Sequence, residues 1–262
     1  MNWNDVGLIL NARKHGESSV IIHAFTREHG RSAGLVRGGT GRRMRGILQP
    51  GSEVTLTWRS RLAEQLGMFT VEALKSHATN LFDAPLALMA SCSALALLDI
   101  VLPESEPHEA LYEATLLLFR SLEQETDIWP LLLIRWELGL LSEIGYGLDL
   151  SRCAATGTTR DLAYVSPKSR RAVSREAGLP YHDKLLKLPV FVQAGRIAEL
   201  GITDVPAGDL LDGLELTGYF IEKFITEHRP NLHLAARERL MTAFRRRSGP
   251  ADLEKNTETN LL

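Results

Sequence analysis

Hydrophobic and polar positions alternate with a period of two over the first 75 residues, which is the pattern of half-buried β-strands. The clearest segment is 52–59 (SEVTLTWR), where Val54, Leu56 and Trp58 alternate with polar neighbours. Closing several such strands into a barrel removes their unpaired edges, so we expect a small closed β-barrel. The predicted strands, separated by glycine-containing turns, are 6–13, 18–25, 31–36, 52–59 and 66–74.

The pattern becomes helical from residue 80 onward. Asp83-Ala84-Pro85 supplies a capping residue and an early proline to a first helix that stops before Pro103. Further helices are predicted over 108–124, 130–144, 210–226 and 232–247. The helix over 130–144 is apolar nearly all round, so we expect it at the centre of the helical core.

These patterns predict a chain of mixed α and β domains. A β-barrel domain is expected over 1–78 and an α-helical domain over 79–247. The helical domain contains a turn-rich insert at 146–190, with a short strand-like piece at 162–165. The polar segment 248–262 is expected to be a flexible tail.

Charge is distributed unevenly along the 262 residues, although the formal net charge is only −2. The first 61 residues hold ten basic and four acidic side chains, a net of +6, and the remaining 201 residues carry −8. Clustered cations are how a protein holds a phosphate backbone, so the barrel is expected to bind nucleic acid and the acidic body to serve protein partners.

The glycine-rich segment 37–46 (RGGTGRRMRG) is the sharpest local feature. Its glycines allow a close backbone approach, and its arginines supply guanidinium groups for phosphates. The alternative is a solvated loop whose charges keep the barrel soluble. Trp3 is a candidate for stacking on bases, whereas Phe25 and Trp58 fit the core better. The candidate nucleic-acid ligands are Arg13, Lys14, Arg31, Arg37, Arg42, Arg43, Arg45, Arg59 and Arg61.

Signatures of catalysis and of metal binding are missing from the sequence. No phosphate-binding loop, no GxSxG and no lysine preceded two positions earlier by an acidic residue occurs, so we expect no enzyme and no cofactor. The turn-rich insert has the residue spacing of a zinc ribbon, but Cys153 is its only thiol. Thr156, Ser174 and Ala177 stand where the other thiolates would fall, so no metal site is expected.

The compartment follows from cysteine content and from hydropathy. Cys92 and Cys153 do not make a disulfide framework, which indicates a reducing cytosol. No leader pattern is present at the N-terminus, and the longest uncharged run, 84–98, is too short to span a bilayer. A cytoplasmic protein is the expectation.

One face of the helix over 130–144 carries Arg135, Gly139, Ser142 and Glu143. Arg135 is either a structural ion-pair partner, with Glu143 as one candidate, or a cation beside an apolar groove that accepts the carboxylate of a partner. On the pattern alone the ion pair is somewhat favoured.

Several ordered segments resemble the RecO family of bacterial recombination mediators. Singly they are weak, but their order and spacing over nearly the whole chain are specific. They are 7–10 (GLIL), 25–30 (FTREHG), 36–39 (VRGG), 42–51 (RRMRGILQPG), 135–147 (RWELGLLSEIGYG), Cys153, 164–167 (YVSP) and 236–240 (ARERL).

The resemblance implies an N-terminal OB-fold and a helical domain with a degenerate zinc-ribbon-like insert. It implies binding of single- and double-stranded DNA, annealing of complementary strands, and work with RecR and RecF to load RecA onto strands coated by the single-stranded-DNA-binding protein SSB. The helical domain is expected to contact the acidic C-terminal tail of SSB. The resemblance assigns this contact to Arg135, and the other basic candidates are Lys223, Arg237 and Arg239.

Two alternative functions, from other classes of protein, would also account for the basic barrel. One is an RNA-binding or ribosome-associated OB protein, which would use the 2′-hydroxyl. The other is a protein adaptor whose basic segment docks an acidic partner.

Overall fold

A computed structural model describes residues 1–61, 65–77, 81–124, 128–193 and 205–247. Contacts divide the chain into two compact units, which we describe separately. Unit 1 contains residues 1–126 and 234–240, and unit 2 contains residues 127–233 and 241–262. The tail predicted over 248–262 lies outside the described residues.

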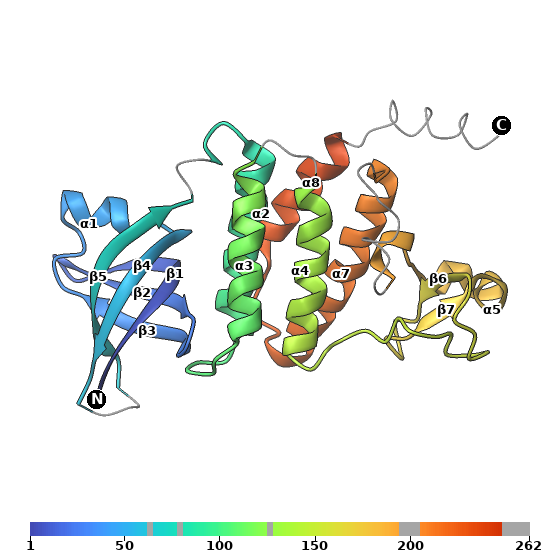
Figure 1. Cartoon of the computed structure of the whole chain (residues 1–262), viewed down its shortest axis with the longest axis horizontal. Coiled ribbons are helices and arrows are strands. Elements are labelled where there is room, and N and C mark those ends of the chain that lie inside the picture. The colour runs from blue at the N-terminus through green and yellow to red at the C-terminus, as the bar shows by residue number, and fades with distance from the viewer. Residues whose placement is uncertain (62–64, 78–80, 125–127, 194–204, 248–262) are drawn as a thin grey trace. The chain divides into compact units, whose positions relative to one another are not determined.

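Five strands at the N-terminus form a closed barrel, as the alternation predicts (Figure 1). Neighbouring strands pair antiparallel except β3 and β5, whose parallel pairing joins Gly34 to Gly67. Going round the barrel the order is β1-β2-β3-β5-β4. The strands are β1 (Asn2–His15), β2 (Ser19–Thr26), β3 (Gly30–Val36), β4 (Ser52–Arg59) and β5 (Gly67–Ser76).

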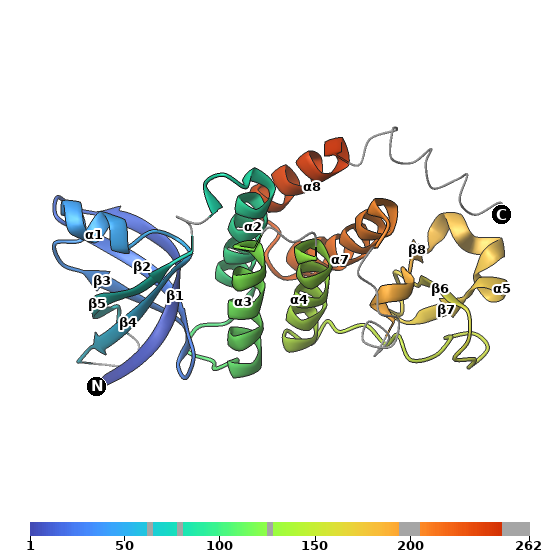
Figure 2. The ribbon, with the colours of Figure 1, turned by 45° about the horizontal axis from the view of Figure 1, so that its top comes forward.

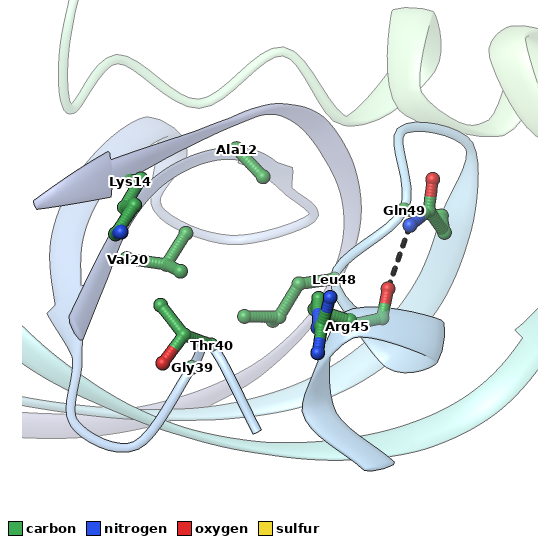
Figure 3. A pocket seen from close by; sticks show the side chains of 8 residues that line it. All are labelled: Ala12, Lys14, Val20, Gly39, Thr40, Arg45, Leu48 and Gln49. Atoms are coloured by element: carbon green, nitrogen blue, oxygen red, sulfur yellow. Dashed lines mark hydrogen bonds between the residues drawn. The ribbon is translucent and has the colours of Figure 1, made fainter. Parts of the chain in front are cut away.

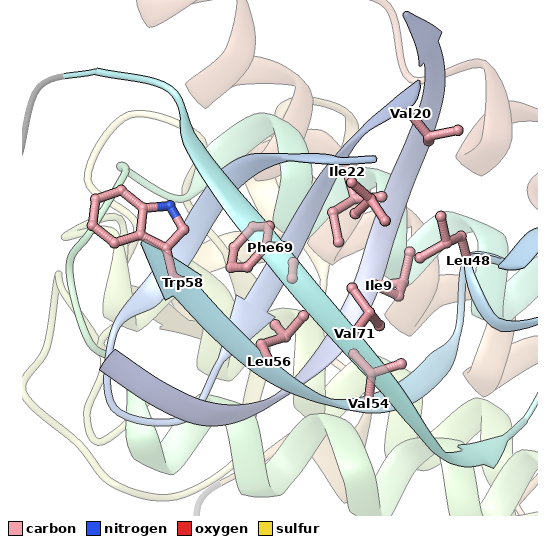
Figure 4. Close-up of a cluster of buried hydrophobic side chains, with 11 residues drawn as sticks. Ile9, Val20, Ile22, Leu48, Val54, Leu56, Trp58, Phe69 and Val71 are labelled. Atoms are coloured by element: carbon pink, nitrogen blue, oxygen red, sulfur yellow. The ribbon is translucent and has the colours of Figure 1, made fainter. Parts of the chain in front are cut away.

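The barrel interior is filled by the side chains of the alternating apolar positions (Figure 4). Val54, Leu56 and Trp58 of β4 all point into this core, which confirms the period of two. The indole of Trp58 packs against Gly67, where an added Cβ would lie 2.1 Å from its Nε1 atom. Phe25 is also buried, but it packs edge-on against Tyr112 of helix α3 (Glu109–Leu122) instead. Both aromatic side chains are therefore core residues, as expected.

A short helix, α1 (Arg42–Ile47), lies within the basic segment and was not predicted. Its sequence contains Gly46 and follows Gly41, and glycine has a low helix propensity. Tertiary packing compensates, because Met44 and Ile47 contact the barrel core and the following Leu48 is buried in it. One side of α1 is therefore fixed against the end of the barrel.

Unit 1 continues with α2 (Pro85–Val101) and α3 (Glu109–Leu122), close to the predicted bounds. Pro85 is in the first turn of α2 as expected, but the N-cap is Ala84 and makes no side-chain capping bond. The prediction that Asp83 caps the helix is therefore wrong. His23 of β2 contacts Asp99 of α2 at 2.6 Å, which joins the barrel to this helix.

Unit 2 is built around α4 (Trp129–Glu143) and α7 (Ala207–His228), which pack together. Gly213 permits the close approach, because a Cβ at this position would lie 2.9 Å from the side chain of Ile134. α4 is buried along most of its length but has one exposed face, so it is not enclosed on all sides. The last helix, α8 (Ala235–Arg247), contributes residues to both units.

The insert in unit 2 folds as a small three-stranded antiparallel sheet with short helices (Figure 2). Its central strand is β6 (Leu162–Val165), which has the predicted bounds. The other elements are β7 (Ala172–Ser174), α5 (Arg175–Gly178), η2 (Leu179–Lys184), β8 (Leu186–Lys187) and η3 (Val190–Val192). Among the described helices of the whole chain, none is long and apolar enough to cross a membrane.

Candidate nucleic-acid interface

Exposed cations gather around the end of the barrel that carries α1. Turn residues after β1 and after β3 are tied together here, because the Thr40 amide donates to the Ser18 carbonyl at 3.2 Å. This contact brings the end of β1 beside the basic segment. We call the resulting group the α1-end cluster; its exposed members are Lys14, Arg37, Arg42, Arg43 and Arg45.

A pocket of about 420 Å³ opens within the α1-end cluster (Figure 3). Lys14 and Arg45 stand on either side of it. The Gln49 side chain closes part of the wall, because its amide Nε2 donates to the Arg45 carbonyl at 2.6 Å. The described residues that line it are Ala12, Lys14, Val20, Gly39, Thr40, Arg45, Leu48 and Gln49.

Arg59 and Arg61 lie at the other end of the barrel. Both are exposed, and Ser60 between them is held by the N-terminus, whose ammonium donates to the Ser60 carbonyl at 2.7 Å. β4 runs the length of the barrel and has eight residues, so the two ends are about 23 Å apart. The predicted DNA ligands are thus divided between two ends. Arg13 is exposed on β1, one residue before Lys14.

Arg31 is the predicted ligand that the structure places elsewhere. It is only 7% exposed, and its Nε donates to the Leu102 carbonyl at 2.9 Å. Its guanidinium also contacts Glu104 at 3.2 Å. Arg31 therefore fixes β3 to the end of α2, and its buried guanidinium does not face solvent as the predicted DNA ligand would. The hydrophobic pattern of β3 does not predict that the Arg31 side chain is buried.

Trp3 also has another role than the one predicted. Its indole stacks on the His29 ring at a centroid distance of 4.2 Å and on the Trp58 ring at 5.6 Å. The His29 Nδ1 is in turn 2.9 Å from Asp5. These contacts make Trp3 part of the packing at the end of the barrel, where its indole stacks on protein rings and not, as predicted, on bases.

On α4, Arg135 shares an exposed face with Gly139, Ser142 and Glu143, as predicted. Arg135 and Glu143 are eight residues apart, about 12 Å along a helix, which is twice the four-residue spacing at which side chains on a helix pair directly. Apart from its chain neighbours and the backbone of its own helix, nothing lies within 4 Å of the position of a Cβ on Gly139, so the surface at Gly139 is open. This arrangement fits the second interpretation of Arg135 better than the first.

The other basic candidates of the helical domain differ in exposure. Lys223 is half-buried and its Nζ donates to the Pro167 carbonyl at 3.0 Å, which fixes α7 to the insert. Arg237 is buried, with an exposed fraction of 4%. Neither is placed to receive a partner. Arg239 is exposed on α8.

Cys153 is buried in the insert, and its sulfur accepts hydrogen bonds from two of the positions compared with zinc ligands. The Ser174 amide donates at 3.2 Å and the Thr156 amide at 3.5 Å. Burial raises the pKa of the Cys153 thiol, but these bonds together with the Ser174 hydroxyl outweigh it and lower the pKa to about 6. In the described part of the chain no three His, Cys, Asp or Glu residues are grouped to hold a metal ion.

A closed five-stranded barrel with exposed cations at its ends, followed by helices, defines a protein of the OB-fold class. Comparison with known families gives the particular group. Residues 1–77 match "Recombination protein O N terminal", and residues 83–233 match "Recombination protein O C terminal". The chain belongs to the RecO family.

Curated relatives agree over most of the chain. The DNA repair protein RecO of Rhodospirillum centenum is 46% identical over 248 residues, which cover 94% of this chain and 96% of the relative. That of Methylobacterium nodulans is 48% identical over 238 residues, covering 91% and 96%. That of Mesorhizobium japonicum is 47% identical over 246 residues, covering 94% of each. Membership of this family supports a role in DNA repair.

Proposed function

We propose that this protein is a non-catalytic mediator of DNA repair and homologous recombination. It binds single- and double-stranded DNA, anneals complementary strands, and helps RecR, with RecF, to load RecA onto SSB-coated DNA. The observation that carries the DNA-binding part is the α1-end cluster, whose exposed cations come from β1, the turn after β3 and α1.

The mechanism rests on electrostatics. Arg42, Arg43 and Arg45 have no ion-pair partner among the described residues, so their charges are available to phosphates. Binding releases the counterions condensed on DNA, and this release drives association. Cations that neutralise phosphates on two strands lower the repulsion that opposes pairing. Because phosphate contacts carry no sequence information, binding is sequence-tolerant.

Partner binding is assigned to the helical domain. The exposed Arg135 on α4, next to the open surface at Gly139, receives the terminal carboxylate of the SSB tail. Arginine suits this role because its planar guanidinium binds a carboxylate through two hydrogen bonds. Arg239 is the second exposed candidate, on a different helix.

Annealing of two complementary oligonucleotides, bare or coated with the cognate SSB, tests both parts. The triple variant Arg42→Ala/Arg43→Ala/Arg45→Ala is expected to fail on both substrates. Arg135→Ala is expected to anneal bare DNA normally and to fail only when SSB is present. A triple variant of exposed arginines elsewhere, Arg120→Ala/Arg152→Ala/Arg160→Ala, removes the same charge and should retain activity.

The outcomes separate the alternatives. If the wild type anneals neither substrate, the mediator function is wrong. If equal-length single-stranded RNA competes better than DNA, an RNA-binding function replaces it, because RNA recognition exploits the 2′-hydroxyl. If Arg239→Ala and not Arg135→Ala loses the SSB-dependent activity, the partner site lies on α8.

A further inference from the structure

The pocket in the α1-end cluster has two chemically different parts. Its inner surface is aliphatic and comes from Ala12 of β1, Val20 of β2 and Leu48 after α1. Its sides carry the cationic groups of Lys14 and Arg45 (Figure 3). A volume of about 420 Å³ is within the range of small-molecule sites. The pocket therefore fits a ligand with an apolar body and anionic groups next to it.

The shape of the pocket depends on Gly39. A Cβ at this position would lie 2.8 Å from Cβ of Val20 and 3.2 Å from Cδ1 of Leu48. The backbone at Gly39 can therefore lie directly against the aliphatic surface, and no side chain from this residue enters the pocket. The wall is held by the bond from the Thr40 amide to the Ser18 carbonyl.

We propose that this pocket binds one unpaired nucleobase of a single DNA strand, while the adjoining phosphates contact Lys14 and Arg45. This inference rests on the proposed function and adds a base-binding site to it. A duplex cannot use the site, because its bases are stacked and paired. The pocket therefore favours single strands over duplex, and it releases a strand that has paired.

Among the described residues that line the pocket, none has an aromatic ring. The base is therefore held by contacts with aliphatic side chains and not by ring stacking. Aliphatic contact does not discriminate strongly among bases, so the site remains sequence-tolerant. Binding in the pocket also separates the base from its stacked neighbours. A fluorescent base analogue that is quenched by stacking can detect this separation.

Binding of an oligothymidine is compared with binding of an abasic oligonucleotide of the same length and charge, using fluorescence anisotropy and the full chain. The wild type is expected to bind the oligothymidine about tenfold more tightly, which corresponds to burying roughly 55 Å² of apolar base surface against the aliphatic side chains. Ala12→Leu, which fills the pocket, should remove this difference and leave abasic binding unchanged. Ala73→Leu on the exposed side of β5 is the matched control and should behave as the wild type.

A second substitution that fills the pocket keeps the test valid if Ala12→Leu fails to fold. Thr40→Leu enters the pocket from the side opposite Ala12 and should have the same effect (Figure 3). In addition, 2-aminopurine placed in the oligonucleotide should become brighter on binding to the wild type, and less so with either filled variant.

The results distinguish this inference from the proposed function. Equal binding of the two oligonucleotides by the wild type overturns the base pocket and leaves DNA binding intact. Retention of the tenfold difference by a folded Ala12→Leu and a folded Thr40→Leu also overturns it. Failure of the wild type to bind either oligonucleotide overturns the proposed function itself.

Discussion

The Nδ1 atom of His77 lies 2.6 Å from a carboxylate oxygen of Glu123, and this contact joins the end of β5 to the end of α3. The other ring nitrogen, Nε2, lies 2.5 Å from Glu53 of β4. The side chain of His77 is fully buried, and Lys75 contacts the second oxygen of Glu123 at 2.6 Å. A histidine between two carboxylates thus links the barrel to the helix that follows it within unit 1.

Replacement of His77 is expected to destabilise unit 1 strongly. His77→Ala leaves Glu53 and Glu123 largely buried without the group that separates them, at a cost of about 3–5 kcal/mol. His77→Gln should cost less, because its amide still donates. Urea unfolding measures the effect, with the exposed His15→Ala as control. A change below about 0.5 kcal/mol for His77→Ala would contradict the assignment.

Arg31 and Arg42 are expected to respond differently to the same substitution. Arg31→Ala removes a buried guanidinium that bonds to the end of α2, so it should lower the free energy of unfolding by about 3 kcal/mol. Arg42→Ala on exposed α1 should change the stability by less than about 0.5 kcal/mol but weaken DNA binding. The prediction fails if Arg31→Ala unfolds like the wild type.

DNA affinity should depend on salt in proportion to the phosphates neutralised. With about six contacts the log–log slope for a single strand is near −4. Removing the three arginines of α1 should reduce its magnitude by about 2, because each lost contact contributes about 0.7. Titrations at several salt concentrations measure the slope, and a wild-type slope near zero would exclude the electrostatic mechanism.

Cys153 should make the stability of the insert depend on pH. Its thiol pKa is lowered from 9.0 to about 6 in the folded protein. Between these values the unfolded chain binds more protons than the folded one, so stability rises from about pH 6 to pH 9 and is lost as pH falls through 6. Cys153→Ser should flatten this rise in thermal unfolding experiments.

Two controls complete the Cys153 experiment. Cys92→Ser, at an exposed position on α2, should keep the pH dependence of the wild type. A strong zinc chelator should leave the melting temperature unchanged, because a single thiol cannot assemble a tetrahedral site. A fall in melting temperature with the chelator would show that the protein carries a metal after all.

Much of the architecture could be predicted from local patterns. The alternation around Trp58 identified β4 with its bounds, since the inner face of a strand must be apolar when a barrel closes around it. The helices were found for the same reason, because burial imposes a period of 3.6 on the sequence. The shared exposed face of Arg135 and Gly139 follows from helical geometry alone.

Other features depended on contacts between distant residues. α1 exists because Met44 and Ile47 reach the barrel core, although its local sequence does not favour a helix. The pocket depends on Gly39 lying against Val20, nineteen residues earlier in the chain. The hydrophobic periodicity of a short segment contains no information about contacts with residues far away in the sequence.

The sequence by itself determined that the chain has a basic barrel and an acidic helical part, because composition and periodicity are properties of neighbouring residues. Only the tertiary structure decided which cations are available. Arg31 and Arg42 are the same residue type in the same basic region, yet Arg31 is buried against Leu102 and Glu104 while Arg42 is exposed. The physical reason is that a guanidinium can satisfy its donors either within the fold or with phosphates, and chain topology selects between them.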